Sequence, residues 1–349
     1  MKLDFTPAEK AVLYGLVRYP TLNDRQLSEK IKVKPSTTTA IRRRLRERDI
    51  FQTRRVPMAN KLGYEILVFV FGRIKPDTKK PEMNKLLKWV KEVPGIVHAF
   101  MSSESMCCIG FFKNYSEYRK LADDVWEAFG DKGPLDPKSW KSVVFSFEHC
   151  KLANFFDYSS PLRHLFKVEE KSDFSRELET VTEEHLSKKE KVVLGGLVKY
   201  PESSDKDVAE KVGASRQAVS SMRKRFEEKG ILRTMRILNL EKLGYQMIAV
   251  GHLVFQPKAP LTVRWEGVER TARVSPMILW VTSSPETVAV GLMRDYDELH
   301  ELRGDFLEYY AKRGYYSEEP SVSLFPVSDT RVVKDFDFSG FMNRLIKED

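Results

Sequence analysis

The feature that most constrains this chain is an internal repeat. Shifting the 349-residue sequence by 181 positions aligns residues 6–76 with residues 187–257 without a gap, and 23 of these 71 positions are identical. The identities include the run KLGY, which occurs at Lys61–Tyr64 and again at Lys242–Tyr245. Self-similarity over such a length indicates one structural plan used twice. We call the two copies the first repeat and the second repeat.

The repeat extends through most of the chain. Ser102-Ser103 falls on Ser283-Ser284 at the same shift, and Phe156–Ser159 matches Phe336–Ser339 at a shift of 180. Residues 167–185 are charged, carry few large apolar residues and have no counterpart before residue 6, so we expect a linker there. The expected domains flanking this linker are residues 1–65, 66–166, 186–246 and 247–349.

Each repeat opens with a pattern typical of a winged helix-turn-helix. In the first repeat, apolar residues at helical spacing predict a helix over residues 8–18, followed by a short helix capped by Asn23 or Asp24. Ser36 is expected to cap the third helix of the first repeat, and Ser215 the third helix of the second. A β-type stretch follows each third helix. Three short helices with a tight second turn, and then a strand, describe a winged helix-turn-helix.

Positive charge is concentrated in these opening segments. The chain has a net charge of +9, and residues 1–66 hold 15 Lys and Arg against 7 Asp and Glu, while residues 182–247 hold 14 against 10. Short polar side chains at the start of a third helix, followed by basic ones, suit contacts to base edges and phosphates in a DNA groove. We therefore predict double-stranded DNA as the partner. The predicted DNA contacts are Ser36, Thr37, Thr39, Arg42, Arg43, Arg46, Arg54 and Arg55 in the first repeat, and Arg216, Gln217, Ser220, Ser221, Arg223, Lys224 and Arg236 in the second. The alternative is a solvated basic face on a winged helix that contacts protein.

The second part of each repeat has the order strand, helix, strand, strand, helix, strand. In the first repeat the expected strands cover residues 66–74, 96–102, 106–113 and 141–149. This order predicts a ferredoxin-like βαββαβ domain, and hence an α+β chain of two tandem units. Several strands are apolar on both faces, as in ILVFVF and CCIGFF, and sheets with two apolar faces are covered on both. We therefore expect the two sheets to pack face to face as an internal pseudo-dimer, with a homodimer of the chain as a further option.

The winged helix, the KLGY run and the βαββαβ order together resemble the Lrp/AsnC (feast/famine) family, over nearly the whole chain and twice. The resemblance implies a transcription regulator whose α+β domain senses a small-molecule effector near the loop between its second and third strands. The family pattern in that loop is G-x-Y/F-D, whereas this chain has SSES and SSPE. The expected effector contacts are therefore Ser102, Ser103, Ser283 and Ser284, and the missing glycine and aromatic argue against an amino acid as the effector.

Siroheme decarboxylases also resemble Lrp/AsnC proteins and supply an enzymatic alternative. Their H-N-Y-x-R-x-H type segment corresponds to His98–Cys108 of this chain, where only the histidine His98 is retained. The second repeat has Leu279 at the place of His98. We therefore expect a DNA-binding regulator, with no catalytic residues, and not an enzyme.

Other classes of site leave no pattern in the sequence. There is no G-x-G-x-x-G, P-loop, H-E-x-x-H or spaced CxxC pair, so we expect no cofactor and no metal. The cysteines Cys107, Cys108 and Cys150 are too few for a disulfide framework and fit a reducing cytoplasm. Val288 and Ala289 replace Cys107 and Cys108 in the second repeat, which favours a packing role over a redox pair.

No N-terminal signal is visible and no apolar run approaches the roughly 18 residues that span a bilayer, so we expect a cytoplasmic protein. Abundant Lys and Glu with scarce Asn and Gln lean weakly toward a thermophile.

Overall fold

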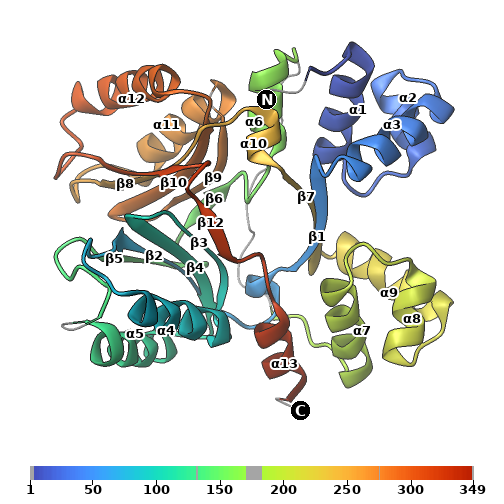
Figure 1. Cartoon of the computed structure of the whole chain (residues 1–349), viewed down its shortest axis with the longest axis horizontal. Helices are drawn as coiled ribbons and strands as arrows, with labels where there is room; N and C mark the ends of the chain where they lie inside the picture. Colours follow the sequence, from blue (N-terminus) through green and yellow to red (C-terminus); the bar gives the residue numbers. More distant parts are fainter. Residues whose placement is uncertain (1–3, 131–132, 170–182, 275, 348–349) are drawn as a thin grey trace. The chain divides into compact units, whose positions relative to one another are not determined.

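The chain divides into two compact units that interleave along the sequence, as the computed structural model shows (Figure 1). The structure describes residues 4–130, 133–169, 183–274 and 276–347. Unit 1 comprises Met1–Thr53, Cys150–Glu177 and Met235–Ser328, and unit 2 comprises Arg54–His149, Leu178–Thr234 and Asp329–Asp349. Each unit therefore combines the opening segment of one repeat with later segments of the other. Most of the predicted linker, residues 170–182, lies outside the described residues.

Unit 1 begins with three short helices whose starts are set by capping residues and a proline. They are α1 (Pro7–Arg18), α2 (Asp24–Ile31) and α3 (Pro35–Glu47). Thr6 caps α1 and Asn23 caps α2, each in a reciprocal hydrogen-bonded box with the third residue of its helix. The N-cap of α3 is Lys34 and not the predicted Ser36, because Pro35 occupies the first helical position and starts the helix two residues earlier.

Unit 2 contains the matching three helices of the second repeat. They are α7 (Lys188–Lys199), α8 (Asp205–Val212) and α9 (Arg216–Glu228). Ser215 caps α9 as predicted, and its Oγ accepts the N–H of Ala218 at 3.2 Å. Strands β1 (Phe51–Pro57) and β7 (Leu232–Leu238) follow α3 and α9 and pair as a two-stranded sheet.

The predicted ferredoxin-like domain of the first repeat is confirmed within unit 2. Its elements are β2 (Ile66–Arg73), α4 (Lys80–Glu92), β3 (Ile96–Met101), β4 (Ser105–Phe112), α5 (Tyr115–Phe129) and β5 (Lys141–Ser146). The strands form an antiparallel sheet in the order β12-β3-β4-β2-β5. Helices α4 and α5 cover one face of that sheet (Figure 1).

The domain of the second repeat has the same element order and lies in unit 1. Its elements are β8 (Met247–Val254), α11 (Leu261–Val274), β9 (Met277–Thr282), β10 (Glu286–Met293), α12 (Tyr296–Ala311) and β11 (Ser321–Pro326). Its sheet has the order β11-β8-β10-β9-β6. Short helices η1 (Ala59–Lys61) and α10 (Leu240–Leu243) mark the two KLGY runs.

The tail of each repeat adds an edge strand to the sheet of the other repeat. Strand β6 (Lys151–Ala153) pairs with β9, and β12 (Arg331–Lys334) pairs with β3. Helix α6 (Ser159–Phe166) then contacts α1 and β9, and α13 (Ser339–Lys347) contacts α7. The two edge strands were not predicted from the sequence, because three or four residues are too few to show a strand period. Among the described residues, no helix has the length and apolar content to cross a bilayer.

Candidate functional site

The third helix of unit 1 presents part of the predicted DNA-contacting set to solvent. Ser36, Thr37, Arg43 and Arg46 are exposed on α3. Arg43 places its Nε 3.8 Å from a carboxylate oxygen of Glu47, and both side chains are largely exposed. An ion pair so exposed is weak, so the Arg43 guanidinium remains available to another anion.

Two other side chains of α3 that were predicted to contact DNA form hydrogen bonds within unit 1. The Thr39 hydroxyl donates to Oδ2 of Asp24 at 2.8 Å, and Arg42 donates through Nη1 to Oδ1 of the same carboxylate at 2.6 Å. Asp24 is the first residue of α2, so these bonds hold α2 against α3. We call Asp24, Thr39 and Arg42 the first brace.

The second repeat has the same brace in unit 2, with more bonds. Arg223 donates from Nε and Nη2 to the two oxygens of Asp205 at 2.9 and 3.0 Å, and from Nη1 to Glu227 at 3.1 Å. Ser220 also hydrogen bonds to Asp205. The hydrogen bonds that Arg223 donates to Asp205 lower the pKa of the Asp205 carboxyl and raise the pKa of the Arg223 guanidinium. We call Asp205, Ser220 and Arg223 the second brace.

Four predicted contacts on α9 face solvent. Arg216, Gln217, Ser221 and Lys224 are exposed and occupy the first three turns of the helix. The division of each third helix into a bound face and an exposed face, made by Asp24 and Asp205, was not predicted. The identity of Asp24 and Asp205 at the 181-residue shift is the signal that points to the braces.

Three further arginines that were predicted to contact DNA make contacts within the units. Arg54 forms an ion pair with Asp335 in unit 2. Burial lowers the pKa of Arg55, which also lies near Arg223 and Asp205. Arg236 is 5% exposed, donates to the carbonyl of Pro20 at 3.2 Å, and lies 5.9 Å from the ring centroid of Phe51. All three guanidinium groups therefore interact with other residues of the chain.

The serines expected to contact an effector lie in tight turns. The Ser103 N–H and hydroxyl both donate to Oδ2 of Asp329 at 2.7 Å, and these bonds lower the pKa of Asp329. Ser102 Oγ accepts the N–H of Ser105 at 3.2 Å. In unit 1 the Ser283 N–H donates to the Glu286 carbonyl at 2.9 Å, and Ser284 precedes a cis proline. The contacts of Ser102 close the turn between β3 and β4, and those of Ser103 join that turn to Asp329 in the segment before β12.

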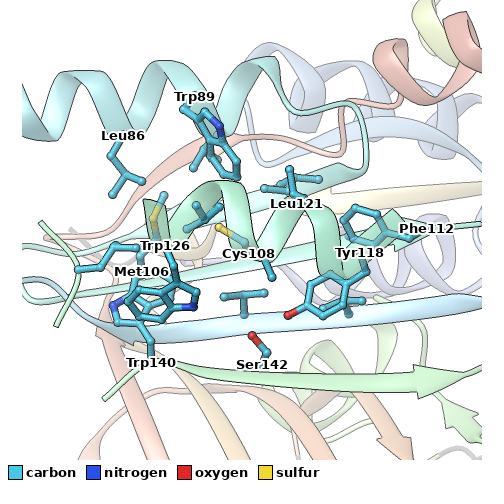
Figure 2. Close-up of a pocket in the computed structure, with 18 residues that line it drawn as sticks. Leu86, Trp89, Met106, Cys108, Phe112, Tyr118, Leu121, Trp126, Trp140 and Ser142 are labelled. Carbon is cyan, nitrogen blue, oxygen red and sulfur yellow. The ribbon is translucent and has the colours of Figure 1, made fainter. Parts of the chain in front are cut away.

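An apolar cavity lies between the unit 2 sheet and its helices, and Figure 2 shows it. Its volume is about 60 Å³, and its walls include Trp89 and Trp126 from the helices and Trp140 from the segment before β5. A polar contact in its wall joins the Tyr118 hydroxyl to Ser142. A space of this size and lining is a packing defect of a domain core, too small for a cofactor.

A larger and more polar cavity opens beside α7 and α13 in unit 2. Its volume is about 440 Å³, and we call it the α7–α13 cavity. Its wall residues come from β1, from α7 and the residues just after it, from the C-terminal end of α8, and from the C-terminal tail. The charged and polar ones are Arg54, Lys199, Tyr200, Lys211, Asp335, Asp337, Ser339 and Asn343, and the apolar ones include Val192, Phe336, Met342 and Ile346.

The single retained histidine of the decarboxylase-type segment is buried against Phe336, which lines this cavity. The His98 ring stacks on Phe336 with centroids 4.1 Å apart. Burial lowers its pKa to about 4, so the imidazole is neutral at pH 7. Its location on β3 puts it in the interior of unit 2, with 8% of its surface exposed.

The cysteines are also placed for packing. Cys107 and Cys108 are buried on β4, and burial raises the pKa of the Cys108 thiol to about 12. A buried thiol of raised pKa is unreactive, which supports the expected packing role. Among the described residues, no three histidines, cysteines or carboxylates gather closely enough to hold a metal ion.

The sequence matches no family profile and no curated protein, but solved structures share its fold. A siroheme decarboxylase, NirDL, in complex with an iron-uroporphyrin III analogue is similar over 98% of this chain and 99% of its own, with a TM-score of 0.55 and 13% identity. A second structure of NirDL covers 97% of this chain with a TM-score of 0.54. Escherichia coli AsnC is similar over 41% of this chain and 93% of its own, with a TM-score of 0.32 and 11% identity.

The full-length likeness corrects one expectation. From the sequence we expect no enzyme, whereas the fold of 98% of the chain is that of a known enzyme. The expectation rested on a missing His-containing segment, which is a local feature and does not decide the class of the whole chain. At 13% identity the likeness shows the fold and carries no substrate or reaction across.

Proposed function

We propose that the chain is a transcription regulator that binds double-stranded DNA through two non-identical winged helix-turn-helix heads. The first head consists of α1–α3 with β1, and the second of α7–α9 with β7. In this proposal the chain is a tandem duplication whose two sheets form an internal pseudo-dimer. The observation that carries the proposal is the division of each third helix into a face bound by a brace and an exposed basic face.

The exposed faces have the chemistry of groove readers. Ser36, Thr37 and Arg43 stand outward on α3, and Gln217 and Lys224 stand outward on α9. The polar groups lie near the helix N-terminus, which is the end of a recognition helix that contacts base edges, and the long cations follow. The two faces differ in sequence, so we expect an imperfect palindrome with unlike half-sites.

Selection of bound sequences from random duplex DNA tests this proposal. We expect enrichment of a bipartite site, with a binding constant that falls steeply as salt concentration rises. Absence of both enrichment and salt-dependent binding would overturn DNA recognition and favour a protein-contacting role for the heads.

A second candidate function is decarboxylation of a tetrapyrrole, and the full-length fold of a siroheme decarboxylase favours it. DNA binding by the heads does not exclude it. The test is to incubate the full chain with siroheme, measure the absorbance of bound tetrapyrrole, and follow loss of carboxyl groups by mass spectrometry. A bound spectrum with decarboxylated product supports an enzyme, and its absence removes this candidate without affecting the first.

A further inference from the structure

We propose that the α7–α13 cavity of unit 2 is a binding site for a small organic acid with an apolar or aromatic body. This proposal does not depend on DNA binding, because it concerns a cavity bounded by described residues of one unit. Its volume of about 440 Å³ lies in the range of small-molecule sites, which is about 300–1,000 Å³.

The wall of the cavity differs in residue type between the two repeats. Gly195 lies on its wall, and the residue 181 positions earlier is Tyr14. Arg54 and Asp335 also line it, and their counterparts in the other repeat are Met235 and Phe155. Tyr14, Met235 and Phe155 are buried at 8%, 4% and 3% exposure in unit 1. The related positions therefore carry large buried side chains in unit 1, and a glycine and two charged residues in unit 2.

The charges in the wall favour an anion. Its two carboxylates are already engaged, since Asp335 pairs with Arg54 and Asp337 accepts the N–H of Ser339 at 2.8 Å. Lys199 and Lys211 instead place their ammonium groups 5.5 and 5.0 Å from the ring centroid of Tyr200. A carboxylate that enters beside that ring gains charge-assisted hydrogen bonds from two lysines.

The apolar residues of the wall favour an apolar body. Phe336 is buried and stacks on His98, so its ring is held rigidly. Met342 and Ile346 lie one turn apart on α13 and flank Gly195, where an added methyl group would lie 3.4 Å from Ile346 and 3.9 Å from Met342. A ligand with a carboxylate at one end and an aromatic or branched group at the other satisfies both sets of wall residues.

Isothermal titration calorimetry on the full chain tests the site, with phenylacetate and indole-3-acetate as probes and their amides as neutral controls. We expect an acid to bind with a Kd below about 1 mM and its amide to bind about tenfold more weakly. Gly195→Tyr, which copies the first repeat, should abolish binding, and Gly195→Ala should retain it because its methyl group meets only ordinary contacts.

A charge variant keeps the test decisive if Gly195→Tyr does not fold. Lys199→Gln combined with Lys211→Gln should reduce the affinity for the acid to that for the amide. The proposal is overturned if neither acid binds, if acid and amide bind equally, or if the acid binds the folded Gly195→Tyr variant as it binds the parent chain.

Discussion

Helices α1–α3 of unit 1 and α7–α9 of unit 2 share a brace but differ in how firmly it is held. In the first brace, Arg42 makes one bond to Asp24, and the two side chains are 34% and 26% exposed. In the second, Arg223 makes three bonds to two carboxylates, and it and Asp205 are 24% and 16% exposed. The same residues at the same spacing therefore hold two helices with unequal strength.

The difference lies in the neighbours of the brace. Arg55 lies close enough to the second brace for its guanidinium to interact electrostatically with Asp205 and Glu227. Thr234 adds a bond of 3.1 Å to Glu227. A brace in this setting is a network, and loss of one carboxylate leaves more than one cation without compensation.

The largest effect is expected on removal of Asp205. Asp205→Ala should lower the free energy of unfolding of unit 2 by about 3 kcal/mol, because it leaves Arg223 and Arg55 poorly compensated in a largely buried place. Asp24→Ala should cost unit 1 only about 1 kcal/mol, since its pair is more exposed. Urea unfolding with amide hydrogen exchange on α8 and α2 measures the two losses. Equal losses would show that the extra bonds of the second brace contribute nothing.

The pH dependence of the second brace has a defined sign. Hydrogen bonds from Arg223 lower the pKa of Asp205 below its ordinary value of 3.8. Its stabilisation is therefore present above about pH 4 and is lost as the pH falls through the lowered pKa of the folded state. Asp205→Asn should remove this acid sensitivity, which melting curves between about pH 5 and pH 2 would report.

A second contrast between the units concerns His98 and its counterpart Leu279. Burial lowers the pKa of His98 from 6.5 to about 4, so between these values the unfolded chain binds a proton that the folded chain does not. Acidification from pH 7 to about pH 4 should therefore cost unit 2 about 2–3 kcal/mol. His98→Leu should flatten this slope in melting curves. An unchanged slope would show that the pKa of His98 does not differ between the folded and unfolded states.

A third contrast concerns the exposed cations of the two heads. Arg43→Ala and Lys224→Ala should each weaken DNA binding by about 1–3 kcal/mol if the side chain touches a base, or reduce the salt slope by about one if it touches a phosphate. Lys206→Ala on α8, which removes a similarly exposed cation, is the matched control. Titration of the selected duplex at several salt concentrations separates these cases, and parental binding by both variants would contradict the assignment of the third helices.

The smallest effect is expected at the helix starts. Ser215 caps α9 with a side-chain hydrogen bond, whereas Lys34 at the start of α3 makes none. Lys34→Ser should stabilise unit 1 by about 0.5–1 kcal/mol, and Ser215→Ala should destabilise unit 2 by a similar amount. Differential hydrogen exchange of α3 and α9 would measure both. No gain from Lys34→Ser would show that Pro35 already fixes the start of α3.

Local periodicity predicts most of the fold, but it does not predict which segments pack together. The βαββαβ order follows from strand and helix patterns in each repeat, and the caps Asn23 and Ser215 follow from residue type. The interleaving does not, because no local pattern in a tail shows which of the two sheets it joins. The exposed face of α3 was predictable from charge, whereas the role of Arg42 was not, since its partner Asp24 lies 18 positions away. The α7–α13 cavity was not predictable, because its wall combines Gly195 with residues of the C-terminal tail and only the fold brings these segments together.

The exchange of edge strands determines when the strand pairs of each sheet can form during synthesis. Strand β6 ends at Ala153, but its partner β9 begins at Met277, which is 124 residues later. At about 5–20 residues per second, that delay is roughly 6–25 s. During this time β6 has a free backbone edge on the ribosome, and pairing with another nascent chain competes with pairing to its own. Slower translation between these two strands should therefore lower the yield of native protein, even though the final fold is unchanged.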